Sequence, residues 1–243
     1  MSRLLYKNIE DRAKIEELIR LDDSILGRYQ GYSPKADYTF LTAPMKHQSG
    51  FMSVHNPISI EFYRKFLKDS TLLDLGCGSE ESYSLMISFA ALCGVKKYGG
   101  INKFDIPTNY YSIDQIKNII LEKKLCNQDQ LPEIQFANED MLKFLSKQEN
   151  NSANIVMFGI DEIIIPFEFK EYHQELAKQI AAVIPKRGFA AGSNTPHLQN
   201  VEKYGLTRMT ELTEGLRLRS RVIKSRTFNN QDREIGDQIY TKT

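Results

Sequence analysis

The sequence has few cysteines, no long apolar run and no apolar leader segment. Only three cysteines occur in 243 residues, at Cys77, Cys93 and Cys126, and none of them forms a Cys-x-x-Cys pair. The cysteine content therefore argues against a disulfide framework and against a thiolate zinc site, and we expect no metal. No stretch reaches the roughly 20 apolar residues that a membrane span needs, and the first residues are too charged for a secretory signal. These absences favour a cytoplasmic protein in a reducing compartment.

The sequence also lacks an excess of charge of either sign. Lys and Arg total 32 and Asp and Glu total 31, so the formal net charge is +1. A dedicated nucleic-acid binder normally has a basic excess, so nucleic acid is not the favoured partner. Hydrophobic residues make up 41% and charged residues 26% of the chain, which is ordinary globular composition. A chain of this length buries a sizeable core without metal or disulfides.

Short apolar runs alternate with helical stretches after residue 70. The runs predict strands at residues 71–75, 97–101, 133–137, 154–160 and 188–192. The helical periodicity predicts helices at residues 58–68, 80–93, 112–125, 139–148 and 169–183. Strands that alternate with helices connect by right-handed crossovers, so they predict a parallel sheet with helices on both faces. The predicted fold class is therefore α/β, with a doubly wound and mostly parallel sheet.

The two ends of the chain differ in pattern from the middle. Residues 1–57 predict an N-terminal cap, with a helix over residues 8–30 and then an irregular stretch that carries the aromatic side chains Tyr29, Tyr32, Tyr38 and Phe40. These aromatics form either a lid over a ligand or the anchor of a long loop, and we prefer the anchor. Residues 58–243 form the α/β domain. Its last segments, 206–226 and 236–242, predict an antiparallel hairpin at the sheet edge.

The most informative stretch is a strand that contains an acid and leads into a glycine-rich turn, Leu73-Asp74-Leu75-Gly76-Cys77-Gly78. Gly76 permits a tight turn, and Gly78 lets the backbone approach a ligand without a Cβ atom between them. Ser79 is a candidate helix cap, with Glu80 and Glu81 in the first helical turn. A glycine pair alone closes many strand–helix turns without any ligand. The acid between apolar residues shifts the balance toward a binding site.

This stretch resembles the first motif of the class I S-adenosylmethionine (SAM)-dependent methyltransferases, which have a Rossmann-like fold. The resemblance continues over about residues 58–243, and five motifs in the right order are specific for the fold, though less so for activity. The further segments that carry it are Tyr98-Gly99-Gly100-Ile101-Asn102, Phe136-Ala137-Asn138-Glu139-Asp140-Met141-Leu142, Ile155-Val156-Met157-Phe158-Gly159, Val183-Ile184-Pro185-Lys186-Arg187-Gly188 and Arg233-Glu234-Ile235-Gly236-Asp237-Gln238-Ile239-Tyr240.

The resemblance implies SAM as the cofactor and a set of residues that hold its methionine half. The backbone around Gly76 and Gly78 would hold this half, with Cys77 between them lining the same pocket. Asp74 would lie beneath it and favour its ammonium group. These residues lie at the carboxyl end of a strand, where ligands of open α/β sheets bind.

The resemblance also implies residues for the adenosine half, which follow the second, third and fourth strands. Asp140 would accept a hydrogen bond from the adenine amino group, and the backbone amide of Met141 would face an adenine ring nitrogen. Asn102 would meet the ribose, and Gly159 would join the pocket from the fourth strand.

Two positions depart from the family's pattern. A third glycine is common after the first two, and here that position is Glu80. The family usually has an acid at the end of the second strand that binds both ribose hydroxyls, and here that position is Asn102. An Asn side chain lacks the bidentate acceptor geometry of a carboxylate. Ribose binding is therefore either weakened or supported by Asp105, and loss of the cofactor site is an open alternative.

A dinucleotide cofactor is the main rival for a glycine-rich turn between a strand and a helix. Such a site places a pyrophosphate on the helix N-terminus, where free amides and the helix dipole attract negative charge. Glu80 and Glu81 occupy that position and would repel a pyrophosphate, whereas SAM carries a sulfonium and an ammonium and no phosphate. Asn102 also lacks the acid expected for an NAD ribose. A P-loop is excluded because no Gly-Lys-Ser/Thr follows the turn.

No catalytic residue is assigned from the sequence. Methyl transfer is a direct displacement at an activated carbon, so positioning supplies most of the rate and a base is needed only if the acceptor must lose a proton. Asp161 and Glu162 follow the fourth strand and either orient an acceptor or are solvated loop acids. The candidate bases are the histidines, each of which we prefer to interpret as exposed or structural: His47, His55, His173 and His197.

The predicted function is that of an SAM-dependent methyltransferase with a small-molecule acceptor. One alternative is a methyltransferase-fold protein without transfer activity, which serves as a binding or regulatory module. The other is an RNA-directed methyltransferase, in which Arg217, Arg219 and Arg221 form one basic face of a strand. We prefer to interpret that run as an edge strand protected by charge. The acceptor and the oligomeric state stay open.

Overall fold

The structure is a computed structural model, and it describes residues 57–78, 80–103, 112–122, 124, 126–158, 169–193, 196–209, 211–213, 216–217, 220–224 and 232–243. The predicted cap, apart from its last residue, lies outside these ranges, with its helix over residues 8–30, its four aromatics, His47 and His55. The candidate helix cap Ser79 also lies outside the described residues, as do Asp105, Gly159, Asp161 and Glu162.

The predicted helices and strands of the middle of the chain are confirmed, although the helix predicted over residues 139–148 is confined to Met141–Leu145, because the Asp140 side chain caps its start. The helices are α2 (Pro57–Leu67), α3 (Glu80–Cys93), α4 (Ile113–Glu122), α5 (Met141–Leu145) and α6 (Lys170–Val183). The strands are β1 (Thr71–Leu75), β2 (Lys97–Asn102), β3 (Glu133–Asn138), β4 (Asn154–Phe158) and β5 (Phe189–Ser193). Two 3-10 helices, η2 (Gln128–Gln130) and η3 (Pro196–Tyr204), accompany them. Among the described helices, none is both long and apolar enough to cross a membrane.

The main sheet has the strand order β3-β2-β1-β4-β5-β10-β6, where β6 is Leu206–Met209 and β10 is Asp232–Lys242. The strands β1 to β5 are parallel, and β10 is antiparallel to both β5 and β6. The chain therefore has the predicted α/β fold, a Rossmann-like doubly wound and mostly parallel sheet with an antiparallel C-terminal hairpin.

The antiparallel C-terminal hairpin lies at the edge of the sheet, as predicted, and β6 is the outermost strand of the main sheet. β10 does not form the edge but lies between β5 and β6, because its residues Gln238, Ile239 and Tyr240 are buried on both faces of the sheet. Residues 206–226 do not form one extended segment. They are divided among β6, β7 (Glu211–Thr213), β8 (Leu216–Arg217) and β9 (Ser220–Lys224).

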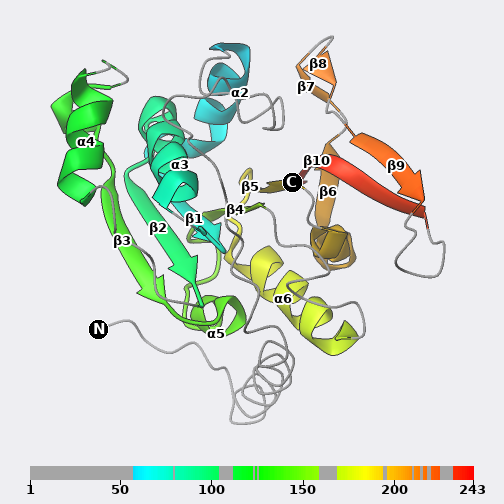
Figure 1. Cartoon of the computed structure of the whole chain (residues 1–243). Coiled ribbons are helices and arrows are strands. Elements are labelled where there is room, and N and C mark those ends of the chain that lie inside the picture. The colour runs from blue at the N-terminus through cyan, green and yellow to red at the C-terminus, as the bar shows by residue number, and fades with distance from the viewer. Residues whose placement is uncertain are drawn as a thin grey trace.

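The helices cover the two faces of the sheet in two groups (Figure 1). α2, α3 and α4 pack on one face, where strand residues such as Leu72, Tyr98 and Ile239 join one hydrophobic cluster. α5, α6 and η3 pack on the other, where Leu73 and Tyr240 join a second cluster. Because side chains alternate along a strand, consecutive residues of β1 and of β10 enter different clusters. We call these clusters the α3-side core and the α6-side core.

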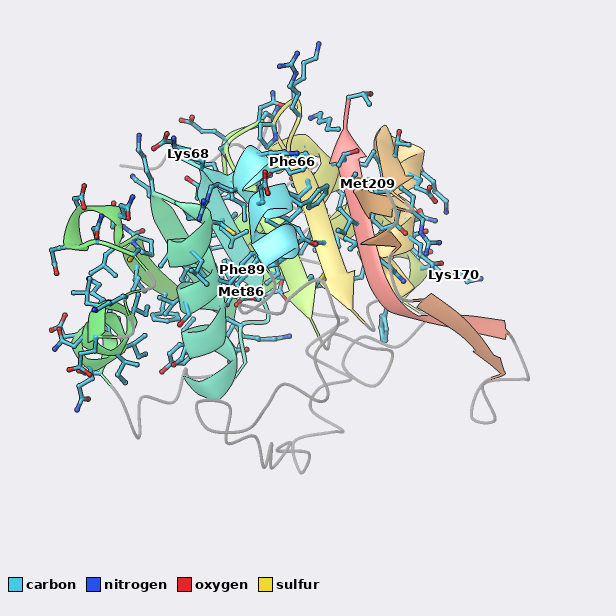
Figure 2. All side chains as sticks on the ribbon, turned by 90° about the horizontal axis from the view of Figure 1, so that it is seen from above. Phe66, Lys68, Met86, Phe89, Lys170 and Met209 are labelled. Atoms are coloured by element: carbon cyan, nitrogen blue, oxygen red, sulfur yellow. The ribbon has the colours of Figure 1, made fainter. Side chains whose placement is uncertain are left out.

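Aromatic side chains join α2 to α3 on the first face. Phe66 projects from α2, and Met86 and Phe89 project from the neighbouring α3 (Figure 2). The ring of Tyr63 on α2 lies edge-on to Phe89, with 5.2 Å between the ring centroids. The same tyrosine packs at 5.4 Å against Phe189 of β5. These contacts fix α2 across the middle of the sheet.

The long strand β10 takes part in two pairings. Its residues 237–242 pair with β5 and β6, whereas residues 232–236 pair with β9. Asp237 lies opposite Ser193, the last residue of β5, so the pair of β9 with residues 232–236 extends past the carboxyl end of that strand. We call this pair the β9–β10 arm, and Figure 1 shows it projecting from the main sheet.

Gly100 provides the first testable prediction, because a side chain there would strike the packed core. A Cβ atom at Gly100 would lie 2.5 Å from two ring carbons of Phe136 and 3.2 Å from the Sγ atom of Cys77. The Phe136 ring is itself packed between Tyr83 and Tyr98. We expect Gly100→Ala to lower the free energy of unfolding by about 1–3 kcal/mol, as overpacking does, in urea denaturation.

The adjacent glycine is the matched control for this prediction. A Cβ atom at Gly99 would meet the terminal methyl group of Leu73 at 2.8 Å, and that group can rotate away. Gly99→Ala should therefore cost clearly less than Gly100→Ala. Equal costs would contradict the view that the rigid Phe136 ring sets the limit.

Candidate cofactor site

The carboxyl ends of the parallel strands form one edge of the sheet. In the register of the sheet, Asn138 of β3 lies opposite Asn102 of β2, and Phe158 of β4 lies opposite Ser193 of β5. These four residues are the last of their strands. Ligands of open α/β sheets bind at this edge, so the predicted site residues at the ends of β1, β2 and β3 lie where a ligand would be expected.

Asp74 is a buried carboxyl group near the end of β1. Only 3% of its surface is exposed, and the Tyr98 hydroxyl of the neighbouring strand donates a hydrogen bond to its Oδ2 atom at 2.7 Å. Burial raises the pKa of Asp74 from 3.8 to about 7, and the hydrogen bond from Tyr98 opposes that rise. A positively charged ligand group placed beside Asp74 would stabilise the carboxylate that burial disfavours.

The turn after β1 has the backbone that its glycines predict. Gly76 has φ +74° and Gly78 has φ +71°, in the left-handed region that favours glycine. The backbone amides of Gly76 and Cys77 both donate to the carbonyl oxygen of Ile101, at 2.8 Å and 3.1 Å. These two amides are therefore used within the sheet and are not offered to an anion, unlike the free amides of a pyrophosphate site.

Cys77 points its side chain into the protein. The residue is buried in the α3-side core, and its Sγ atom lies against the backbone of Gly100. Burial raises the pKa of the Cys77 thiol well above its usual range, and the Asp74 carboxylate adds to the rise. The thiol therefore stays protonated and is no nucleophile, in line with the sequence analysis. Any contact of Cys77 with a cofactor would come from its backbone.

Asp140 is held on both of its carboxylate oxygens. Its Oδ1 atom caps α5, accepting hydrogen bonds from the amides of Leu142 at 2.9 Å and Lys143 at 3.1 Å. Its Oδ2 atom accepts a hydrogen bond from the Tyr172 hydroxyl of α6 at 3.0 Å, and the Lys103 ammonium lies 3.9 Å away. A carboxylate oxygen has more than one acceptor position, so these bonds leave capacity for a further donor.

The end of β2 presents an amide and an ammonium group in place of an acid. Asn102 is half-buried, and its backbone carbonyl accepts a hydrogen bond from the amide of Glu139 at 2.9 Å. The next residue, Lys103, keeps only 22% of its side chain exposed beside Asp140. An ammonium group donates hydrogen bonds but cannot accept them from a ribose hydroxyl. Among the described residues of this strand end, neither Asn102 nor Lys103 supplies the missing carboxylate, and the alternative Asp105 stays untested.

The structure thus brings most of the predicted cofactor residues to one edge of the sheet. Asp74, Gly76, Cys77 and Gly78 lie at the end of β1 and in the turn after it, Asn102 ends the adjacent β2, and Asp140 follows β3. Met141 begins α5 and is half-buried against the α6-side core. Their contacts with a cofactor stay predictions.

The other candidate residues fall into the core or outside the described side chains. His173 lies on α6, is buried, and its ring stands edge-on to that of Tyr172, which is the environment of a structural histidine. The side chains of His197, Arg217 and Arg221 are not among those described, nor is Arg219. The basic run that contains the three arginines is divided between β8 and β9. Within the described ranges, no group of His, Cys, Asp and Glu residues would hold a metal ion.

Sequence reasoning missed the residues that hold the two carboxyl groups. Tyr98 binds Asp74 from β2, Tyr172 binds Asp140 from α6, and Lys103 lies beside Asp140. Each of these contacts joins residues from different elements. The apolar run of β2 indicates that Tyr98 belongs to a buried strand. Only the pairing of β2 with β1 shows that its hydroxyl lies beside the Asp74 carboxyl group.

The sequence matches no protein-family model and no curated protein. Solved structures with a similar arrangement include MnmC2 from Aquifex aeolicus, at 13% identity and a TM-score of 0.46, covering 75% of this chain and 56% of that chain. An SAM-dependent methyltransferase from Methanosarcina mazei is 18% identical, with a TM-score of 0.40 and coverage of 77% and 97%. Precorrin-6y C5,15-methyltransferase from Geobacter metallireducens is 10% identical, with a TM-score of 0.41 and coverage of 74% and 83%. The strand order establishes the architecture independently of these similarities.

Proposed function

We propose that the protein is an SAM-dependent methyltransferase that transfers a methyl group to a small-molecule acceptor. The observation that carries this proposal is the buried Asp74 carboxyl just before a glycine turn whose first two amides are already bonded to Ile101. Such a turn offers a carboxyl group and two amides that are already bonded, which suits a cationic ligand without phosphate better than a dinucleotide. SAM carries a sulfonium and an ammonium group and no phosphate.

The residues at the end of β1 would hold the methionine half of SAM. The Asp74 carboxylate would accept hydrogen bonds from the ammonium group, and charge-assisted bonds of this kind are the stronger ones in proteins. The backbone of Gly76, Cys77 and Gly78 would lie against the same half. The positive φ angles at both glycines support this role, because they shape the turn and leave no Cβ atom at either glycine.

The residues after β2, β3 and β4 would hold the adenosine half. Asp140 would accept from the adenine amino group through the capacity left on its carboxylate, and the Met141 amide would face a ring nitrogen. Asn102 would bind a ribose hydroxyl, and Gly159 would join the pocket. We also retain residues 1–57 as a cap and residues 58–243 as the catalytic domain.

The chemistry of the reaction needs little from the protein beyond position. When bound, the cofactor supplies a methyl group that its sulfonium has already activated. The chain's own task is to hold cofactor and acceptor in line and to exclude water, and such positioning supplies most of the rate of a bimolecular displacement. We therefore assign no general base and no metal to the reaction.

A protein that binds SAM without transferring its methyl group is the second candidate. The end of β2 favours it, because Asn102 and Lys103 stand where a ribose-binding acid would be expected. Binding without turnover over a broad acceptor panel would support this candidate. Any methyl transfer would exclude it.

Calorimetry with SAM and its product S-adenosylhomocysteine (SAH) tests the proposal on the full-length protein. We expect both ligands to bind and NAD to give no heat. Because the Asp74 carboxyl must lose its proton to bind an ammonium group, SAM affinity should increase as the pH rises from about 5 to about 7.5. A folded sample that gives no heat with either ligand would contradict the proposal, and tight NAD binding would replace it.

A further inference from the structure

Gln238 on β10 is a buried amide that the protein leaves unbonded. Only 1% of its surface is exposed, and neither its Nε2 nor its Oε1 atom has a hydrogen-bond partner. Buried polar groups in native proteins are almost always bonded, because an unbonded amide loses its interactions with water and gains nothing in return. Both ends of this side chain therefore need an explanation.

The register of the sheet places Gln238 close to the ligand edge. It lies opposite Gly192 of β5, which in turn lies opposite Met157 of β4. Both β4 and β5 end one residue later, so the Gln238 backbone is only one residue inside the edge, about 3.4 Å along the strand. A side chain stands roughly perpendicular to its sheet, so the Gln238 amide lies over the face of the sheet about one residue inside that edge.

Gln238 lies on the acceptor side of the proposed cofactor. The residues proposed for SAM follow β1, β2, β3 and β4, whereas β10 is separated from β4 by β5 and from β1 by both β4 and β5. Three strand spacings of about 4.8 Å each put Gln238 about 14 Å from β1. A molecule that receives the methyl group must lie beside the cofactor along this edge, and β5 and β10 form the part of the edge left for it.

The side chain of Gln238 shares a face of the sheet with apolar residues and with the half-buried Arg208, which lies opposite Tyr240. Its neighbours in sequence alternate, with Ile239 in the α3-side core and Tyr240 in the α6-side core, so Gln238 shares the face of Tyr240. At the same level of the sheet, Met157 belongs to the α6-side core and Gly192 has no side chain. Neither residue provides a strong hydrogen-bonding side chain for the amide.

We propose that Gln238 recognises the methyl acceptor, and that the acceptor carries a neutral amide-type edge with an N–H donor beside a carbonyl acceptor. This inference rests on the proposed methyltransferase function. A carboxamide has one acceptor end and one donor end, so a lactam or carboxamide group satisfies both ends at once. An anionic group would satisfy only the Nε2 donor and a cationic group only the Oε1 acceptor, so a charged group leaves one end of the amide unbonded.

The test uses two small probes that differ in one hydrogen-bonding group. Benzamide has the proposed amide edge, and methyl benzoate keeps the carbonyl but lacks the N–H donor. Binding of each to the full-length protein saturated with SAH is measured by ligand-observed NMR. We expect benzamide to bind about tenfold more tightly than methyl benzoate, the effect of one net hydrogen bond in a buried site.

Gln238→Leu should remove this preference and leave SAH affinity within about twofold of the wild type, because the residue is remote from the cofactor. The same variant should melt at a higher temperature, since it removes an unbonded buried amide. Gln238→Met, which is unbranched and of similar length, gives the same readout if the leucine variant does not fold. Gln135→Leu is the matched control, because Gln135 is exposed on β3 at the other end of the sheet.

Three results would overturn the proposal. The two probes bind equally to the wild type, or the preference survives in Gln238→Leu and Gln238→Met, or a crystal structure shows one ordered water satisfying both amide atoms while no preference is measured. Each of these leaves SAH binding intact and so leaves the methyltransferase proposal standing. Absence of SAH binding in the wild type would instead overturn both proposals.

Discussion

Gly78→Val is expected to weaken SAM binding at least about 100-fold. Gly78 has φ +71°, a conformation that a β-branched residue adopts only with strain, and its missing side chain is what would let the backbone approach the cofactor. Valine therefore both distorts the turn and fills the proposed contact surface. Calorimetry with SAM measures the affinity, and thermal unfolding of the same sample shows that the variant is folded.

Gly205→Val is the control, because Gly205 also has a positive φ angle but lies at no proposed ligand site. It follows η3 with φ +89°, and a Cβ atom built there meets no atom within 4 Å. Gly205→Val should therefore lose stability through the left-handed backbone, as Gly78→Val does, yet keep its affinity for SAM. Unchanged affinity in folded Gly78→Val would mean that the turn after β1 is not the cofactor site.

Asp74→Asn is expected to change the pH dependence of stability more than any other single substitution. The folded protein raises the pKa of Asp74 from 3.8 to about 7, so between these pH values it binds more protons than the unfolded chain. Its free energy of unfolding must then fall as the pH rises through that interval. A difference of this size corresponds to roughly 4 kcal/mol at most, lost by about pH 8.

The asparagine variant should not show this fall, because its amide carries no proton that titrates. Its Oδ1 atom still accepts the hydrogen bond from Tyr98, so the variant should be more stable than the wild type at about pH 8 and similar at about pH 4. Its SAM affinity at about pH 8 should drop by roughly 10- to 100-fold, since a charge-assisted hydrogen bond is lost. Urea denaturation over a pH series and calorimetry measure the two effects.

Asp129→Asn is the matched control for this substitution. Asp129 is exposed on η2, away from the ligand edge, so its replacement should leave both the pH dependence of stability and the SAM affinity unchanged. A wild-type free energy of unfolding that stays constant between about pH 4 and pH 7 would contradict the burial of Asp74 in an uncharged form. Increased stability together with unchanged SAM affinity would remove Asp74 from the site while keeping its burial.

The helices and strands could be predicted because their signals are local. The run Thr71–Leu75 is apolar apart from its acid, and the predicted strand and the observed β1 have the same bounds. The 80–93 helix is confirmed at both of its ends as α3. In both cases the hydrophobic pattern of consecutive residues predicts the element, so no information about neighbouring elements is needed.

The placement of β10 could not be predicted in the same way. Its sequence shows that residues such as Gln238 and Tyr240 belong to an extended segment, but a strand buried on both faces can pair with any neighbour. The insertion between β5 and β6 depends on hydrogen bonds to residues about 30 to 50 positions away, such as Tyr240 with Arg208 and with Ala190. Such pairings follow from the whole sheet and have no local signature.

The candidate site was predictable in its residue types and unpredictable in its hydrogen bonds. The motif around Asp74 indicates a carboxyl group at the end of a strand, and the structure confirms that position. Nothing in the motif shows that the Tyr98 hydroxyl donates a hydrogen bond to this carboxyl, or that one carboxylate oxygen of Asp140 caps α5. The state of both acids in the free protein depends on these partners and on burial, which arise only when distant segments pack.

Because β10 pairs both with β5 and with β9, the proposed recognition of the acceptor by Gln238 depends on the register of β10 to within one residue. Because side chains alternate, a slip of β10 by one residue against β5 would turn the Gln238 amide to the opposite face and present the hydrocarbon of Ile239 in its place. The β9–β10 arm continues the same backbone without interruption, so a molecule that pulls on the arm pulls directly on this alignment. A force on the β9–β10 arm can thus change the register of β10 and with it the side chain that lies at the ligand edge.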